Sequence, residues 1–106
     1  MSDSPPVPPD RLDIRDVPDA LRYEARDTAS GSAPAPVAVA SYSMAGTMIT
    51  FEHTRVPDAM AGRHVGTRLV KFALDDVRSR GLRVVPRCPF VAAYIKRHKE
   101  YQDLLA

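Results

Sequence analysis

One amphipathic segment in the second half of the sequence constrains the fold most strongly. Between about His64 and Arg80, apolar side chains recur at helical spacing on one side, while charged side chains occupy the others. Gly81 follows as a stop signal, with Arg78 and Arg80 in the last turn, where the helix dipole favours cations. The segment therefore predicts a long helix whose apolar stripe consists of Leu69, Val70, Ala73, Leu74 and Val77.

The start of this predicted helix lacks the usual capping residues. No Ser, Thr, Asp or Asn lies in residues 60–64, so the first backbone N–H groups need another partner. Gly62 and Gly66 allow a close approach of the backbone, and Arg63 and His64 add donors of their own. Two interpretations stand: a phosphate-bearing ligand binds this terminus, or glycine or water caps an ordinary surface helix.

Alternation of apolar and polar residues predicts a sheet that packs with this helix. Three runs before the helix have that pattern: residues 21–26, 37–44 and 47–54. Gly46 lies in a short link between the last two runs, which predicts a hairpin. Residues 82–85 form a short fourth strand that Pro86 ends, and a right-handed crossover makes it parallel to the preceding strand. A second helix begins near Pro89, so the expected class is α+β: a mixed, mainly antiparallel sheet in the order β-β-β-α-β-α, with one parallel pair.

Length and composition indicate one small globular domain. The chain has 106 residues, of which 44% are hydrophobic and 26% charged. Residues 1–18 are proline-rich and aperiodic, which predicts a flexible leader followed by a domain over residues 19–106. A net charge of +2 with mixed signs argues against a nucleic-acid binder, and no apolar run is long enough for a membrane span. The single cysteine favours a reducing, cytoplasmic location.

Three segments of the sequence resemble the GNAT N-acetyltransferase superfamily, in particular its very small members of the YjdJ or NATD1 type. These segments are residues 49–56, 62–70 and 83–101. The resemblance covers roughly residues 20–105, nearly the whole expected domain. It implies a compact domain with acetyl-coenzyme A as cofactor and an unidentified amine as acceptor. We expect a monomer or a weak homodimer without a nucleic-acid or membrane partner.

The resemblance also implies which residues bind the cofactor. In the superfamily, backbone N–H groups of a glycine loop hold the pyrophosphate, and the pantetheine arm lies between two splayed parallel strands. The groove would therefore be made by residues 52–56 and 84–88. The favoured register aligns His64 with the first family glycine and Gly66 with the second, and a histidine there reduces backbone freedom. The cofactor-binding residues implied in this way are His53, Thr54, Val56, Gly62, Arg63, His64, Val65, Gly66, Thr67, Arg68, Cys88, Pro89 and Tyr94.

Three residues are candidates for catalysis, each with a structural alternative. Glu52 and His53 alternate along their strand, so at most one should face a given cleft; His53 suits a general base or packs within the sheet. Tyr94 falls where many superfamily members carry the tyrosine that protonates the coenzyme A thiolate. It either has that role or is a core tyrosine. Cys88 either carries the acetyl group or fills space, and the direct transfer usual in the superfamily favours the second role.

The expected function is acetyl-coenzyme A-dependent N-acetylation of an amine by direct transfer. The alternative, from a different class, is a non-catalytic module that binds coenzyme A or an acyl derivative. His98 is expected to be a surface residue favoured by the helix dipole. The histidines and Cys88 lack metal-ligand spacing, so no metal is expected.

Overall fold

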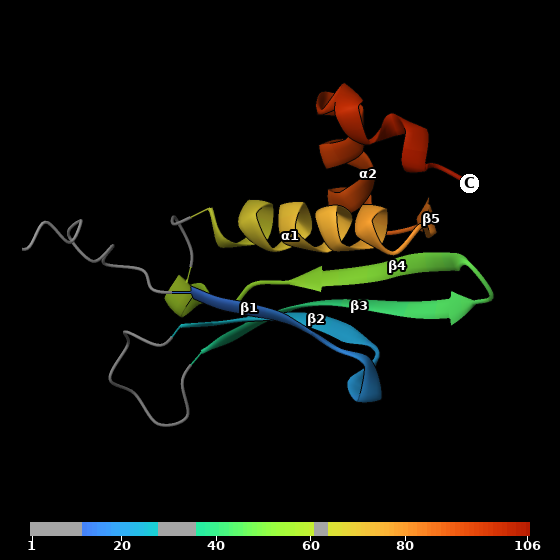
Figure 1. The fold of residues 1–106 in the computed structure, drawn as a ribbon. Coiled ribbons are helices and arrows are strands. Elements are labelled where there is room, and N and C mark those ends of the chain that lie inside the picture. Colours follow the sequence, from blue (N-terminus) through green and yellow to red (C-terminus); the bar gives the residue numbers. More distant parts are fainter. Residues whose placement is uncertain (1–11, 28–35, 61–63) are drawn as a thin grey trace, which may run out of the picture.

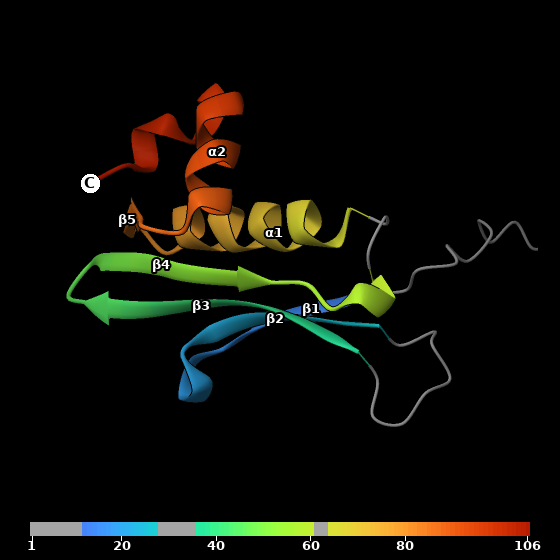
Figure 2. The same ribbon diagram turned by 180° about the vertical axis from the view of Figure 1, so that it is seen from behind.

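A computed structural model of the chain describes residues 12–27, 36–60 and 64–106. Five strands form one sheet in the order β1-β2-β3-β4-β5. The strands are β1 (Leu12–Val17), β2 (Arg22–Asp27), β3 (Val37–Ala45), β4 (Met48–Arg55) and β5 (Arg83–Pro86). Two helices, α1 (Val65–Ser79) and α2 (Pro89–Arg97), lie on the same face of the sheet (Figure 1, Figure 2). A short 3-10 helix, Lys99–Leu104, follows α2.

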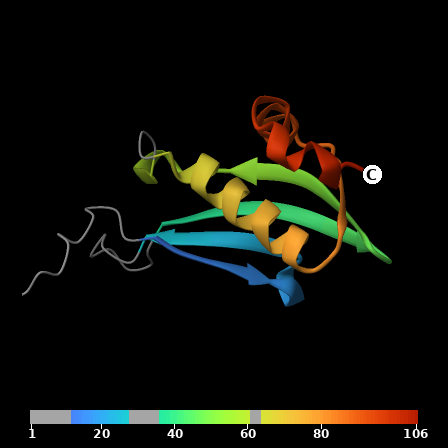
Figure 3. The ribbon, with the colours of Figure 1, turned by 45° about the horizontal axis from the view of Figure 1, so that its top comes forward.

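The core lies between the sheet and α1. All five residues of the predicted apolar stripe are buried, which confirms the helix and its inward face. They pack against the inner sides of the central strands, where Tyr23, Ala25, Ala38, Ala40, Tyr42, Ile49 and Phe51 are buried. Burying each larger apolar side chain contributes roughly 1.5–3 kcal/mol, which is why this face determines how the helix sits. Figure 3 shows α1 crossing the sheet obliquely, with α2 beside it.

The first strand corrects the expected domain boundary. Leu12–Val17 forms β1, which pairs antiparallel with β2, so the flexible-leader prediction is wrong for these residues. Four strands, not three, therefore precede α1. The alternation is hard to recognise because Asp16 occupies an inward position. Its carboxylate accepts hydrogen bonds from the Tyr42 hydroxyl at 2.6 Å and from Arg80 at 2.9 Å, both far away in sequence. Of the rest of the predicted leader, Pro18 begins a short 3-10 helix, Pro18–Ala20, and residues 1–11 lie outside the described residues.

The predicted parallel pair is confirmed. β4 and β5 pair in parallel from Met48 with Arg83 to Phe51 with Pro86. The crossover between them runs through α1, as expected for a strand–helix–strand connection. On the other side of β5, the Ala106 N–H donates to the Val84 carbonyl at 2.9 Å.

A shift of register in β4 sets the direction of the side chains near its end. Ser41 faces His53 and Tyr42 faces Phe51, so Glu52 is an extra residue between two paired positions. Such a bulge reverses the alternation that follows it, because side chains otherwise point to opposite faces in turn. Beyond the bulge, Thr54 faces the buried Ala40 and therefore shares the helix-covered side of the sheet.

Candidate active site

β4 and β5 separate at their carboxyl ends. The last ladder pair is Phe51 with Pro86, and Pro86 has no N–H to extend the ladder. The Cys88 N–H then donates to the Phe51 carbonyl at 2.9 Å, and Pro89 begins α2. β4 continues to Arg55 along β3, while the chain after β5 turns away into the helix. We call the region between Thr54 and Cys88 the strand opening.

Two predicted cofactor residues meet at the strand opening. The Thr54 Oγ1 atom lies 3.3 Å from the Cys88 sulfur, and either atom can be the donor. Cys88 is 4% exposed, so its thiol belongs to the wall of the opening. Its carbonyl accepts the Ala92 N–H at 3.0 Å and thereby starts α2. Thr54 and Cys88 are thus well placed to define the shape of the opening.

The two candidate bases lie on the opposite side of the sheet from Cys88. His53 pairs with Ser41 on the outer face, and Glu52 accepts a hydrogen bond from the Ser43 hydroxyl at 3.1 Å on that same face. The expectation that Glu52 and His53 point to opposite faces is therefore wrong. The expectation assumed a strand without a bulge. The bulge turns the successive side chains of Glu52 and His53 to the same face of the sheet. His53 is exposed and Glu52 is half-buried.

Tyr94 lies in the middle of α2 and is 7% exposed. Its ring stacks on His98, with centroids 4.0 Å apart and an interplanar angle of 16°. Burial is the main cause that raises the pKa of the Tyr94 phenol, so it is protonated at neutral pH. Among the described residues, none makes a hydrogen bond to its hydroxyl. His98 is half-buried against this ring, which corrects its assignment as a plain surface residue.

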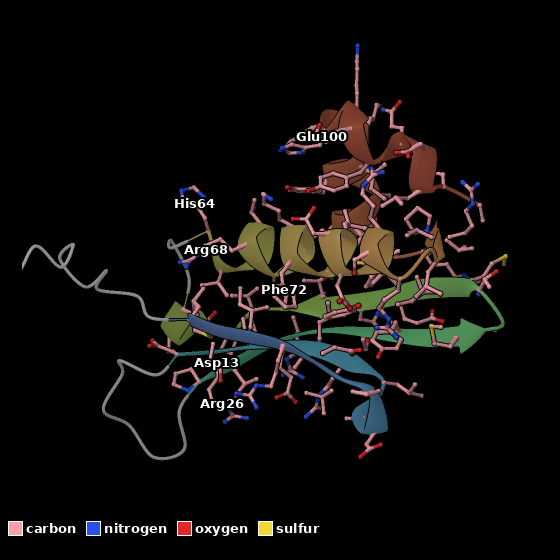
Figure 4. The ribbon with its side chains drawn as sticks, viewed as in Figure 1. Asp13, Arg26, His64, Arg68, Phe72 and Glu100 are labelled. Carbon is pink, nitrogen blue, oxygen red and sulfur yellow. The ribbon has the colours of Figure 1, made fainter. Side chains whose placement is uncertain are left out.

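The start of α1 has an unusual backbone conformation. His64 precedes the helix with φ 56° and ψ 30°, the left-handed region that favours glycine. His64 is also the residue that the alignment with the family glycine loop places at the first glycine. No side chain caps this terminus among the described residues, and no acidic residue lies in the first turn. His64 and Arg68 both extend from this end of α1 (Figure 4), while Gly62 and Arg63 lie outside the described residues.

Phe90 connects the start of α1 with the strand opening. A Cβ atom added to Gly66 would lie 3.0 Å from Phe90 Cζ and 3.4 Å from Val56 Cγ2. Gly66 therefore allows the Phe90 ring to pack closely on the first turn of α1. The sequence analysis missed Phe90, although it directly follows the Cys88-Pro89 pair. Val65 is buried beside this contact, and Thr67 is exposed on the first turn.

Most of the predicted site residues in the described part of the chain form two neighbouring groups, bridged by Phe90, whereas His53 on the outer face of the sheet and Tyr94 against His98 belong to neither. One group contains His64, Val65, Gly66, Thr67 and Arg68 at the start of α1; the other contains Thr54, Cys88 and Pro89 at the strand opening. In the described part of the chain, no three His, Cys, Asp or Glu side chains group to hold a metal ion. None of the helices within the described ranges is long and apolar enough to cross a membrane.

Comparison with known proteins identifies the family. A family model described as GCN5-related N-acetyl-transferase matches residues 22–104. Protein NATD1 from Homo sapiens and from Mus musculus are each 37% identical over 62 residues, or 58% of this chain. The match spans only 55% and 56% of the length of those two relatives. The NMR structure of a GCN5-like protein from Staphylococcus aureus matches with a TM-score of 0.65 and 23% identity, covering 90% of this chain and 88% of that one, which supports the fold alone. Because the family model spans most of the chain, this protein belongs to the GCN5-related N-acetyltransferase family.

Proposed function

We propose that this protein transfers an acetyl group from acetyl-coenzyme A directly to an amine. The observation that carries the proposal is the strand opening, where the β4–β5 ladder ends at Phe51 and Pro86 beside Thr54 and Cys88. The uncapped start of α1 is linked to this opening through Phe90 and Gly66. A thioester arm that enters between the strands would therefore have its phosphates near a helix N-terminus.

The residues at the start of α1 suit a pyrophosphate. The backbone N–H groups at the start of α1 lack a side-chain cap among the described residues. A helix N-terminus with such donors attracts anions through both hydrogen bonds and the helix dipole. The Thr67 hydroxyl and the Arg68 guanidinium add donors on the first turn. We assign these groups to the phosphates and the strand opening to the pantetheine arm.

The chemistry requires one proton to leave the amine and one to reach the sulfur. When bound, acetyl-coenzyme A supplies an acetyl group activated as a thioester. Glu52 and His53 lie on the outer face of the sheet, and we assign the proton acceptor for the incoming amine to His53. The Tyr94 phenol donates the proton that the departing sulfur needs, since no described residue occupies its hydroxyl. The Cys88 thiol keeps a positional role in the wall.

Binding and turnover are tested separately. Isothermal calorimetry with coenzyme A should show saturable heat, and the ligand should raise the melting temperature, because it binds the native state. Incubation with acetyl-coenzyme A and a panel of primary amines should release free thiol for at least one amine. Binding without thiol release would favour the coenzyme A-binding module. Absence of heat and of a thermal shift at millimolar coenzyme A would reject both functions.

A further inference from the structure

His98 is joined to Tyr94 by two separate contacts. The imidazole and phenol rings stack with centroids 4.0 Å apart, and His98 Nδ1 lies 2.9 Å from the Tyr94 carbonyl oxygen. A carbonyl oxygen only accepts, so Nδ1 carries the hydrogen of this bond. Nε2 is then the ring nitrogen without a hydrogen in the neutral imidazole.

The end of α2 holds the imidazole in this place. The His98 backbone N–H donates to the carbonyls of Tyr94 at 3.0 Å and Ile95 at 3.2 Å. The Tyr94 carbonyl therefore receives both the backbone and the ring N–H of the same histidine. The 3-10 helix Lys99–Leu104 begins at the next residue, so the chain is held on both sides of His98. The ring folds back onto the preceding turn and covers the phenol.

Two tyrosines lie together here, but only one has a free hydroxyl within the described chain. The rings of Tyr94 and Tyr101 are 5.8 Å apart. The Tyr101 hydroxyl donates to Asp75 at 2.6 Å, and the Lys71 ammonium donates to the same carboxylate at 2.8 Å. The Tyr94 hydroxyl, in contrast, has no hydrogen-bond partner among the residues that the structure describes. It is the phenol whose proton remains available to a bound molecule.

We propose that His98 is a positioning residue that aims the Tyr94 phenol and, through its charge, adjusts how readily that phenol gives up a proton. The inference rests on the proposed function, which makes Tyr94 the proton donor. An imidazolium stacked on the phenol stabilises the phenolate that remains after the transfer. The other charged groups around Tyr94 are Lys71 and Asp75 from α1 and Glu100 from the 3-10 helix. Lys71 and Asp75 pair with each other, which leaves His98 as the ionisable group in ring contact with the phenol.

Two substitutions separate the contacts. His98→Asn keeps a side-chain N–H donor near the position of Nδ1 and removes the ring and its charge. His98→Phe keeps a ring to stack and removes the donor and the charge. Lys96→Ala is the matched control, because Lys96 is an exposed residue of the last turn of α2. Far-ultraviolet circular dichroism checks that each variant is folded.

The first measurement needs no turnover. With ¹³C-labelled tyrosine ring carbons, the Tyr94 signal should move with the same pH midpoint as the His98 ring protons in the wild type and in Lys96→Ala. In His98→Asn and His98→Phe the movement should be absent. A wild-type Tyr94 signal that does not follow the His98 titration would overturn the coupling.

The second measurement is the pH profile of thiol release. Both His98 variants should lose about tenfold or more in kcat with little change in KM for acetyl-coenzyme A, and should lose the profile limb that matches the His98 titration. Unchanged kcat and pH profile in an active background would overturn the positioning role. A wild type that is itself inert with every amine would instead reject the proposed function, while the tyrosine signal still reports the coupling.

Discussion

The Thr54 hydroxyl lies 3.3 Å from the Cys88 sulfur and joins two segments that are 34 residues apart in the sequence. This contact depends on the bulge at Glu52, which turns Thr54 toward the helices. It places the cysteine in the wall of the strand opening with a polar neighbour. A buried thiol in such a wall controls shape more readily than it attacks a ligand.

Replacing Cys88 should therefore affect stability more than chemistry. Cys88→Ala should keep most of the thiol-release rate and lower the free energy of unfolding by about 1 kcal/mol, because a small buried volume is lost. Urea denaturation and steady-state thiol release measure the two effects. Loss of turnover in a folded variant, together with an acetylated wild-type chain in intact-protein mass spectrometry, would instead support an acyl-cysteine intermediate.

Removing the Tyr94 hydroxyl should slow turnover without weakening cofactor binding. Tyr94→Phe keeps the stacked ring and should lower kcat by roughly 10- to 1000-fold, within or just below the usual range for losing a general acid. Coenzyme A affinity, measured by calorimetry, should barely change. Tyr101→Phe is the comparison, because its hydroxyl is already bonded to Asp75, and it should alter kcat far less. Equal turnover of wild type and Tyr94→Phe would leave solvent as the proton source.

The left-handed backbone at His64 predicts a stabilising substitution. Non-glycine residues are disfavoured by about 1–2 kcal/mol at φ near 56°, while glycine loses more chain entropy on folding. His64→Gly should therefore raise the free energy of unfolding by about 0.5–1 kcal/mol. His64→Ala, which keeps the strain and removes an exposed ring, should change it little. Urea denaturation compares the three proteins, and equal stability of the Gly and Ala variants would contradict the expected strain.

Gly66 and Phe90 should show energetic coupling. Alanine is favoured over glycine in helices by about 1 kcal/mol, but here its Cβ would lie 3.0 Å from Phe90 Cζ. Gly66→Ala should therefore be more favourable in a Phe90→Ala background than in the wild type, by about 0.5–1.5 kcal/mol. A double-mutant cycle of unfolding free energies measures this difference. Additive effects would show that the ring moves aside without cost.

Stability at high pH should depend on Tyr101. Burial, followed by the hydrogen bond to Asp75, raises the pKa of Tyr101 to about 12. The folded state thus favours the neutral phenol, and this contribution is present below the ordinary tyrosine pKa of about 10. It is lost as the pH rises through about 12. Burial also raises the pKa of Tyr23 and Tyr42, so Tyr101→Phe should make the alkaline loss of stability shallower without abolishing it, as measured by denaturation at several pH values.

The sequence predicts those parts of the fold that repeat locally. The apolar stripe of α1 and the short strand before Pro86 follow from spacing and chain breakers, and both are confirmed. β1 was missed because Asp16 is satisfied by Tyr42 and Arg80, partners that no local pattern reveals. The faces of Glu52 and His53 were wrong because a bulge depends on the partner strand. The contact of Phe90 with Gly66 likewise joins two helices, and local periodicity contains no signal for it.

The bulge at Glu52 gives β4 one residue more than its pairing with β3 needs. Removing that residue would leave Phe51, His53 and Thr54 in plain alternation, so His53 would stay on the outer face and Thr54 would still lie toward the sulfur of Cys88. A residue inserted between His53 and Thr54 would instead turn Thr54 to the outer face. Deletion of Glu52 should therefore preserve the strand opening, whereas a single-residue insertion after His53 should disable it.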